Sequence, residues 1–180
     1  MGCSIHVVAE TRDGGKWNLS DVEVPNGRNY FTFGILANVR NGFVSAGCDL
    51  GDPLPFISEP RGYPEDMSKE LVAKLGSDDE DGFWLGDHSF SWVTLEEMLN
   101  YAYDEEIVTR GMVSSEQAAK FRETGEKPKE WYDWTNKEGY EHLEWKRPMK
   151  EAAWLFGEIV EKLIPLGKPE NVRIVFGFDS

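Results

Sequence analysis

The sequence contains few residues of the kinds that build covalent or metal-based scaffolds. Its 180 residues include only two cysteines and three histidines. Cys3 and Cys48 form no Cys-x-x-Cys pair, whereas a closed zinc site needs four ligands at short spacings. We therefore expect no bound metal, and we interpret both cysteines as buried reduced thiols. A chain of this length can bury enough surface for an ordinary hydrophobic core, and we expect one domain over residues 1–180.

Positive charge and long apolar runs are also scarce. Nineteen lysines and arginines stand against 33 aspartates and glutamates, which gives a formal net charge of −14 and a pI near 4.6. Nucleic acids and anionic membranes attract proteins mainly through an excess of cations, so we expect neither as a partner. No run approaches the roughly 20 apolar residues that cross a bilayer. The opening MGCSIHVVAE lacks a signal-peptide pattern, and we expect a cytoplasmic protein.

The common catalytic motifs are missing. The chain has no G-x-x-x-x-G-K-[ST] phosphate loop, no G-x-S-x-G nucleophile elbow and no H-E-x-x-H zinc helix. These absences argue against P-loop phosphoryl transfer, serine hydrolysis and zinc proteolysis. We expect no cofactor. The acidic run at residues 77–81 lacks the alternating ligands and the later bidentate acid of a calcium loop. We interpret this run as a solvated loop.

The apolar pattern predicts an α+β protein. Residues 4–10 and 16–24 flank the turn at residues 13–15 and predict an N-terminal hairpin. Capping boxes begin at Thr94 and Ser114. Helices are expected near residues 29–40, 68–75, 94–103, 114–123 and 148–163, and strands at 107–113 and 172–178, whereas His142 is interpreted as helical. This order favours a mixed or antiparallel sheet with an N-terminal hairpin, a C-terminal strand and helices packed mainly on one face.

Two arginines stand at predicted turns and are candidates for binding an anion. Arg28 and Asn29 precede a predicted helix, where free backbone N–H groups, the helix dipole and a guanidinium can meet one phosphate. The alternative, to which we give slightly more weight, is that Asn29 only caps the helix and Arg28 pairs with a surface acid. Arg61 lies beside Glu59, and its alternative role is a local ion pair in the turn.

His6 and His88 are candidates for acid–base chemistry because both lie in non-helical segments. Neutral imidazoles facing one cavity can cleave a phosphodiester without a metal. A lone histidine in a strand is more often a hydrogen-bonded core residue. The two-histidine phosphoesterase signature needs a hydroxyl side chain two positions after each histidine, whereas Val8 and Phe90 stand there.

Several tryptophans and tyrosines fall in predicted loops, where their rings are available to stack on bases. These candidates are Trp84, Trp92, Trp131, Tyr132 and Trp134. The alternative is core packing, which must account for most of the seven tryptophans.

Landmarks along nearly the whole chain resemble a family of small phage and prophage proteins. They are MGCSIH at residues 1–6, GRNY at 27–30, ILANVRNG at 35–42, EPRG at 59–62, HSFSWVTL at 88–95 and VRIVFGFD at 172–179. The resemblance implies a phage origin, and phages encode small proteins that capture or destroy the cyclic nucleotide or ADP-ribose signals of host immunity. We therefore expect action in the cytoplasm of the infected bacterial host.

Three hypotheses follow. In the first, the protein sequesters a nucleotide-derived immune signal without turnover, and its ligand-binding residues are Arg28, Asn29, Tyr30, Arg40, Arg61, Ser89 and Trp92. The second is a metal-independent phosphodiesterase in which His6 and His88 act as general base and acid. The third is an acidic inhibitor of a host enzyme, for which the net charge of −14 is the support. The oligomeric state stays open, with a homo-oligomer among the alternatives.

Overall fold

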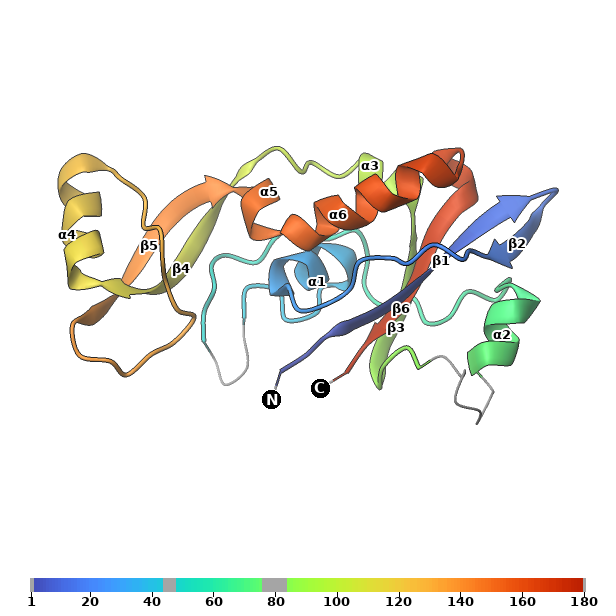
Figure 1. Cartoon of the computed structure of the whole chain (residues 1–180), viewed down its shortest axis with the longest axis horizontal. Coiled ribbons are helices and arrows are strands. Elements are labelled where there is room, and N and C mark those ends of the chain that lie inside the picture. Colours follow the sequence, from blue (N-terminus) through green and yellow to red (C-terminus); the bar gives the residue numbers. More distant parts are fainter. Residues whose placement is uncertain (1, 44–47, 76–83, 180) are drawn as a thin grey trace.

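The centre of the structure is a four-stranded antiparallel sheet with the order β2-β1-β6-β3. The computed structural model describes residues 2–43, 48–75 and 84–179 (Figure 1). The strands are β1 (Ile5–Asp13), β2 (Lys16–Leu19), β3 (His88–Thr94) and β6 (Val172–Phe178). Because β1 and β2 form a hairpin and β6 is the last strand, the predicted α+β class, N-terminal hairpin and C-terminal strand are confirmed. The acidic run at residues 77–81 lies outside the described residues.

The helices cover mainly one face of this sheet, as predicted. Strand residues such as Ile5, Ile174 and Phe178 belong to one large apolar cluster together with Phe33, Leu95 and Phe156. The helices that contribute to this cluster are α1 (Tyr30–Ala37), α3 (Leu95–Leu99), α5 (Met149–Ala152) and α6 (Trp154–Leu163). The opposite face carries a smaller cluster in which Val8 and Val175 meet Leu71 of α2 (Lys69–Leu75).

The central strand β6 is buried on both faces, since all seven of its residues are buried. On the face of α2, Arg173 is directly opposite Glu10 of β1, and an ion pair of 2.7 Å joins Nη2 to Oε2. Arg173 also pairs with Asp66 at 2.7 Å, and its guanidinium lies 3.9 Å from the centre of the Trp17 ring. A charged pair therefore sits inside the smaller core.

A second unit, residues 106–148, extends beyond α1 and α5 on the side away from the β1–β2 hairpin, and we call it the arm (Figure 1). It consists of β4 (Glu106–Ser114), α4 (Ser115–Thr124) and β5 (Tyr140–Pro148). The two strands pair along their whole length, with Glu106 opposite Pro148 and Ser114 opposite Tyr140. Val113, Ala118, Leu143 and Trp145 form its own small core. Ile107 belongs to the main cluster and joins the arm to the rest of the protein.

Several predicted elements differ from the structure. His142 is not helical but lies in β5, because Leu143 and Trp145 alternate with exposed residues and pair with β4. The helix expected at 29–40 ends at Ala37, since Asn38 adopts a left-handed conformation with φ 56°. The helix expected at 94–103 ends at Leu99. The long helix expected at 148–163 is divided at Ala153 into α5 and α6.

Candidate functional site

A cavity of about 430 Å³ lies where the arm meets the start of α1 and the junction of α5 and α6. This volume is typical of small-molecule sites. The cavity is lined by Arg28, Asn29, Tyr30, Phe31, Leu50, Thr109, Arg110, Trp131, Asp133, Arg147, Glu151, Ala152 and Trp154. It therefore combines arginines, aromatic rings and two carboxyl groups from segments far apart in the chain.

Arg147 is the half-buried cation of this cavity. It lies on the same side of β5 as Leu143 and Trp145, and its Nε donates a hydrogen bond of 2.9 Å to Thr109 Oγ1 of β4. Its Cζ lies 5.2 Å from the centre of the Phe31 ring and 4.9 Å from that of Trp131. Burial lowers the pKa of Arg147, and the charges of Glu151 and Asp133 oppose this effect. The terminal nitrogens of Arg147 form no hydrogen bond or ion pair with any residue that the structure describes.

Asn29 caps the helix α1, which was the alternative interpretation of this residue. Its Oδ1 caps α1 by accepting a hydrogen bond of 2.8 Å from the Thr32 N–H, and its Nδ2 donates to the Ala152 carbonyl at 2.9 Å. Both ends of the side chain are thereby occupied. Asn29 fixes the start of α1 against α5, and in this way it shapes the cavity wall.

The sequence candidates Arg28, Tyr30 and Arg40 meet around Cys3. Arg28 is exposed and its Nε donates to the Cys3 carbonyl at 3.2 Å, while the Cys3 N–H donates to the Tyr30 hydroxyl at 3.3 Å. The Arg40 guanidinium lies 5.5 Å from the centre of the Tyr30 ring. Burial raises the pKa of the Cys3 thiol, although Arg40 opposes the shift. Arg28 and Tyr30 also line the cavity, whereas Arg40 does not.

Arg110 at the cavity edge is already neutralised. It pairs with Asp49 at 3.2 Å, with Asp52 at 2.7 Å and with Glu144 at 2.8 Å, and these contacts raise its pKa. This network joins the 49–52 segment to both strands of the arm. Gly51 permits the approach, because a Cβ atom there would clash with the Val108 carbonyl oxygen. Arg110 thus builds the wall of the cavity.

Arg61 and Trp92 lie together, away from this cavity. Two nitrogens of Arg61 bind the Glu97 carboxylate at 2.6 and 3.1 Å, and its Cζ lies 4.9 Å from the centre of the Trp92 ring. Glu97 also completes the capping box of Thr94. Arg61 therefore forms an ion pair, as its alternative interpretation expected, but its partner is Glu97 and not Glu59. Glu59 instead accepts a hydrogen bond from Asn38.

The structure places His6 and His88 on opposite faces of the sheet. His6 is directly opposite Gly177 and His88 is directly opposite Phe178. Directly opposed residues of antiparallel strands share a face, and successive residues alternate between faces. His6 Nε2 lies 3.1 Å from Asp179 Oδ2, whereas His88 Nδ1 lies 2.9 Å from Ser89 Oγ. The two histidines therefore do not meet in one site, and Ser89 lies with His88.

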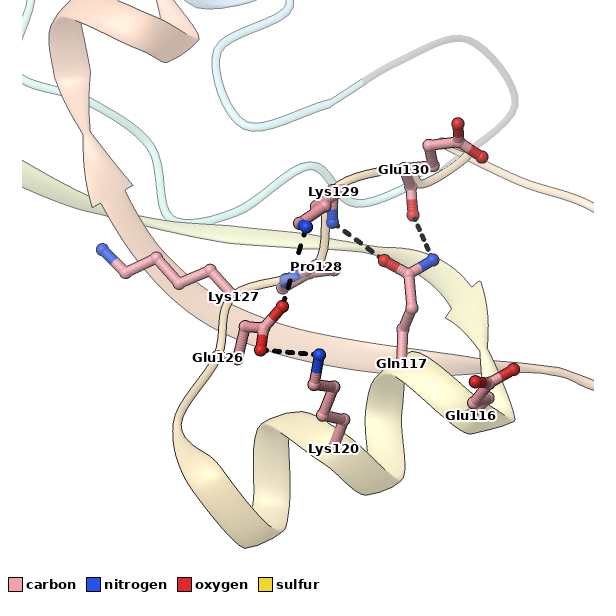
Figure 2. A pocket seen from close by; sticks show the side chains of 8 residues that line it. All are labelled: Glu116, Gln117, Lys120, Glu126, Lys127, Pro128, Lys129 and Glu130. Carbon is pink, nitrogen blue, oxygen red and sulfur yellow. Dashed lines mark hydrogen bonds and ion pairs between the residues drawn. The ribbon is translucent and has the colours of Figure 1, made fainter.

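A second cavity lies between α4 and the 126–130 loop, but its polar groups already bind one another (Figure 2). Lys120 pairs with Glu126 at 2.7 Å, and Lys129 pairs with the same carboxylate at 3.8 Å. Gln117 accepts from the Lys129 N–H at 2.8 Å and donates to the Glu130 carbonyl at 3.3 Å. No aromatic ring lines this cavity. The contacts hold the loop onto α4 and leave the cavity around Arg147 as the stronger candidate.

The search for known relatives supplies no further assignment. No protein-family model, curated protein or solved structure matches the chain, so the phage-family resemblance stays a prediction. Within residues 2–43, 48–75 and 84–179, no group of three or more metal-ligating side chains is present. No helix in this described part is long and apolar enough to span a membrane.

Sequence reasoning missed Arg147, Asp133 and Trp154. Arg147 and Thr109 are 38 residues apart and meet only because β4 pairs with β5. The alternation of Leu143, Trp145 and Arg147 was the signal that could have identified the strand.

Proposed function

We propose that the protein binds and sequesters a nucleotide-derived anionic small molecule, without turnover, in the cavity around Arg147. The observation that carries this proposal is the Arg147 guanidinium, which lies against the Phe31 and Trp131 rings with its terminal nitrogens unused by the described residues. A half-buried guanidinium without a direct ion pair is costly, and the charges of Glu151 and Asp133 offset this cost only in part, since the pKa of Arg147 is still lowered. An anionic ligand supplies a direct partner, and a guanidinium matches the geometry of phosphate oxygens.

Aromatic side chains in the same cavity support a ligand that also carries flat rings. Trp131 is half-buried there, and Trp154 is 45% exposed. Stacking of a base on an aromatic ring stabilises binding by roughly 1–3 kcal/mol. Arg28 and Tyr30 from the predicted set complete the wall, and Arg28 provides a second exposed guanidinium.

Binding is favoured over the phosphodiesterase hypothesis because neither His6 nor His88 lines the cavity. Its one hydroxyl besides Tyr30, that of Thr109, already accepts from Arg147. The phosphodiesterase hypothesis needed His6 and His88 in one site, and no observation favours it. The role as a phage protein that removes an immune signal in the host cytoplasm rests on the sequence resemblance alone.

The test is to incubate the purified protein with a panel of cyclic dinucleotides and cyclic ADP-ribose isomers, remove the protein by filtration, and then release bound material by heating. Sequestration predicts that one nucleotide disappears from the filtrate and returns intact after heating. The Arg147→Met variant should fail to deplete it. The Arg122→Met variant is the matched control, because Arg122 lies on α4, outside the cavity lining, in an exposed pair with Glu141.

A new product peak would overturn sequestration in favour of catalysis. Absence of depletion for every nucleotide would overturn the proposal and favour a protein partner.

A further inference from the structure

Asp133 is an acceptor without a hydrogen-bond donor in the cavity that holds Arg147. Its carboxyl group forms no hydrogen bond and no ion pair with the residues for which the structure gives a position. Asp133 is exposed, but protein atoms near its carboxyl raise its pKa, and the charge of Arg147 opposes the shift. Two unused carboxyl oxygens therefore lie in the same cavity as the unused nitrogens of Arg147.

The backbone just before Asp133 is anchored to the strands of the arm. The preceding residue, Tyr132, is joined to Met112 of β4 by two hydrogen bonds, from the Tyr132 N–H at 2.9 Å and from the Met112 N–H at 2.8 Å. Trp131, just before it, packs edge-on against Trp145 of β5 with ring centres 5.5 Å apart. Asp133 thus directly follows a segment that is held by both strands of the arm, which anchors its backbone, while its side chain is exposed.

The two carboxylate oxygens match one nucleobase edge better than the others. A carboxylate accepts two parallel N–H donors. The Watson–Crick edge of guanine offers such a pair, N1–H and N2–H, whereas adenine, cytosine and uracil each place only one donor group on that edge beside acceptors. We propose that Asp133 binds the N1–H and N2–H groups of guanine, so that the ligand of this cavity is a guanine nucleotide. This inference rests on the proposed function, since it assumes that a nucleotide enters the cavity.

In this arrangement, different side chains of the cavity contact the phosphate and the base. Arg147, with Arg28 at the opening, meets the phosphate, and Asp133 meets the base. Glu151 also lines the cavity, and its charge favours that of Arg147. The matched control for Asp133 is therefore Asp13, an exposed aspartate at the end of β1 that does not line the cavity.

The test is isothermal titration of the full chain with guanosine, inosine, adenosine and xanthosine 5′-monophosphates. Guanosine monophosphate should bind tightest, and inosine monophosphate, which lacks the N2 amino group, about 10-fold more weakly. Asp133→Asn should weaken guanosine monophosphate about 10- to 100-fold and strengthen xanthosine monophosphate. The reason is that an amide N–H donates to the xanthine O2 while the amide oxygen still accepts from N1–H.

A misfolded variant would not bind xanthosine monophosphate more tightly. The gain in affinity of Asp133→Asn for this nucleotide therefore distinguishes a change in base recognition from a loss of stability. Asp13→Asn should leave the affinities and the order of the four nucleotides unchanged. Equal binding of all four to the unmodified protein, with no change in Asp133→Asn, would overturn guanine recognition and leave the proposed function standing. Failure of all four monophosphates to bind would overturn guanine recognition, whereas the proposed function falls only if the panel of cyclic nucleotides is not depleted either.

Discussion

Arg147 and Trp131 come from different segments of the arm and line one cavity, with the Arg147 Cζ 4.9 Å from the centre of the Trp131 ring. The ring shields the guanidinium from water on one side, and Phe31 of α1 contacts it as well. The charge is thereby held where the arm meets the helical layer. A cation placed in this way is ready to bind an anion, because its long side chain is already ordered.

Replacing Trp154 by alanine should weaken nucleotide binding with little loss of stability. Trp154 lines the cavity but is 45% exposed, so its ring is available for stacking and adds little to the core. The expected loss of binding free energy is about 1 kcal/mol or more, measured by titration. Trp134→Ala, which removes a more exposed tryptophan outside the cavity lining, is the control. Equal losses in the two variants would contradict the assignment.

Replacing Arg61 by methionine should reduce stability and leave binding unchanged. The side chain clamps the 59–62 turn to Glu97 and lies over Trp92, away from the cavity. Loss of this partly exposed ion pair should lower the free energy of unfolding by about 1 kcal/mol, measured by urea denaturation. A large loss of nucleotide affinity in this variant would show that Arg61 belongs to the binding site.

Glu97 should contribute to stability only above acidic pH. Burial acts to raise the pKa of Glu97, but hydrogen bonds from Arg61 and Thr94 outweigh it and hold the pKa below its usual value of 4.5. The folded state therefore binds fewer protons than the unfolded state. The stabilisation is complete well above pH 4.5 and is lost as the pH falls through the lower folded value.

The Glu97→Gln variant should consequently show a weaker loss of stability below pH 4.5 than the unmodified protein, as followed by urea denaturation at several pH values. Glu96→Gln changes the exposed neighbour on α3 and serves as the control. If Glu97→Gln and the unmodified protein lose stability in parallel, the carboxylate is not the titrating group.

Replacing Glu10 by glutamine should be strongly destabilising. Glu10 is fully buried and faces Arg173, which is 1% exposed, so the variant leaves a buried guanidinium with only Asp66 as a counterion. The expected cost is about 3 kcal/mol, measured by urea denaturation. Asp66→Asn alters the exposed end of the same network and should cost less. A larger loss of stability in Asp66→Asn than in Glu10→Gln would show that Asp66 is the main counterion of Arg173.

The local signals in the sequence predicted the fold better than they predicted the site. Thr94 and Ser114 cap α3 and α4 as expected, because a capping signal is contained within four residues. The full capping box forms only at Thr94, since the Gln117 side chain binds the 126–130 loop instead. The strands β3 and β5 were missed, since their partners lie far away in the chain and charged residues interrupt the apolar pattern of β5. The sequence pointed to Arg28, Asn29 and Tyr30 because they mark the start of a helix, and all three line the cavity. Arg147 and Asp133 were missed because only strand pairing brings them to it.

The most direct test is a crystal structure of the protein with the nucleotide that it depletes from the panel. Binding at the proposed site predicts phosphate oxygens within hydrogen-bond distance of the terminal nitrogens of Arg147 and a base stacked on Trp131 or Trp154. A nucleotide bound instead at Arg61 and Trp92, or beside His6 or His88, would contradict it.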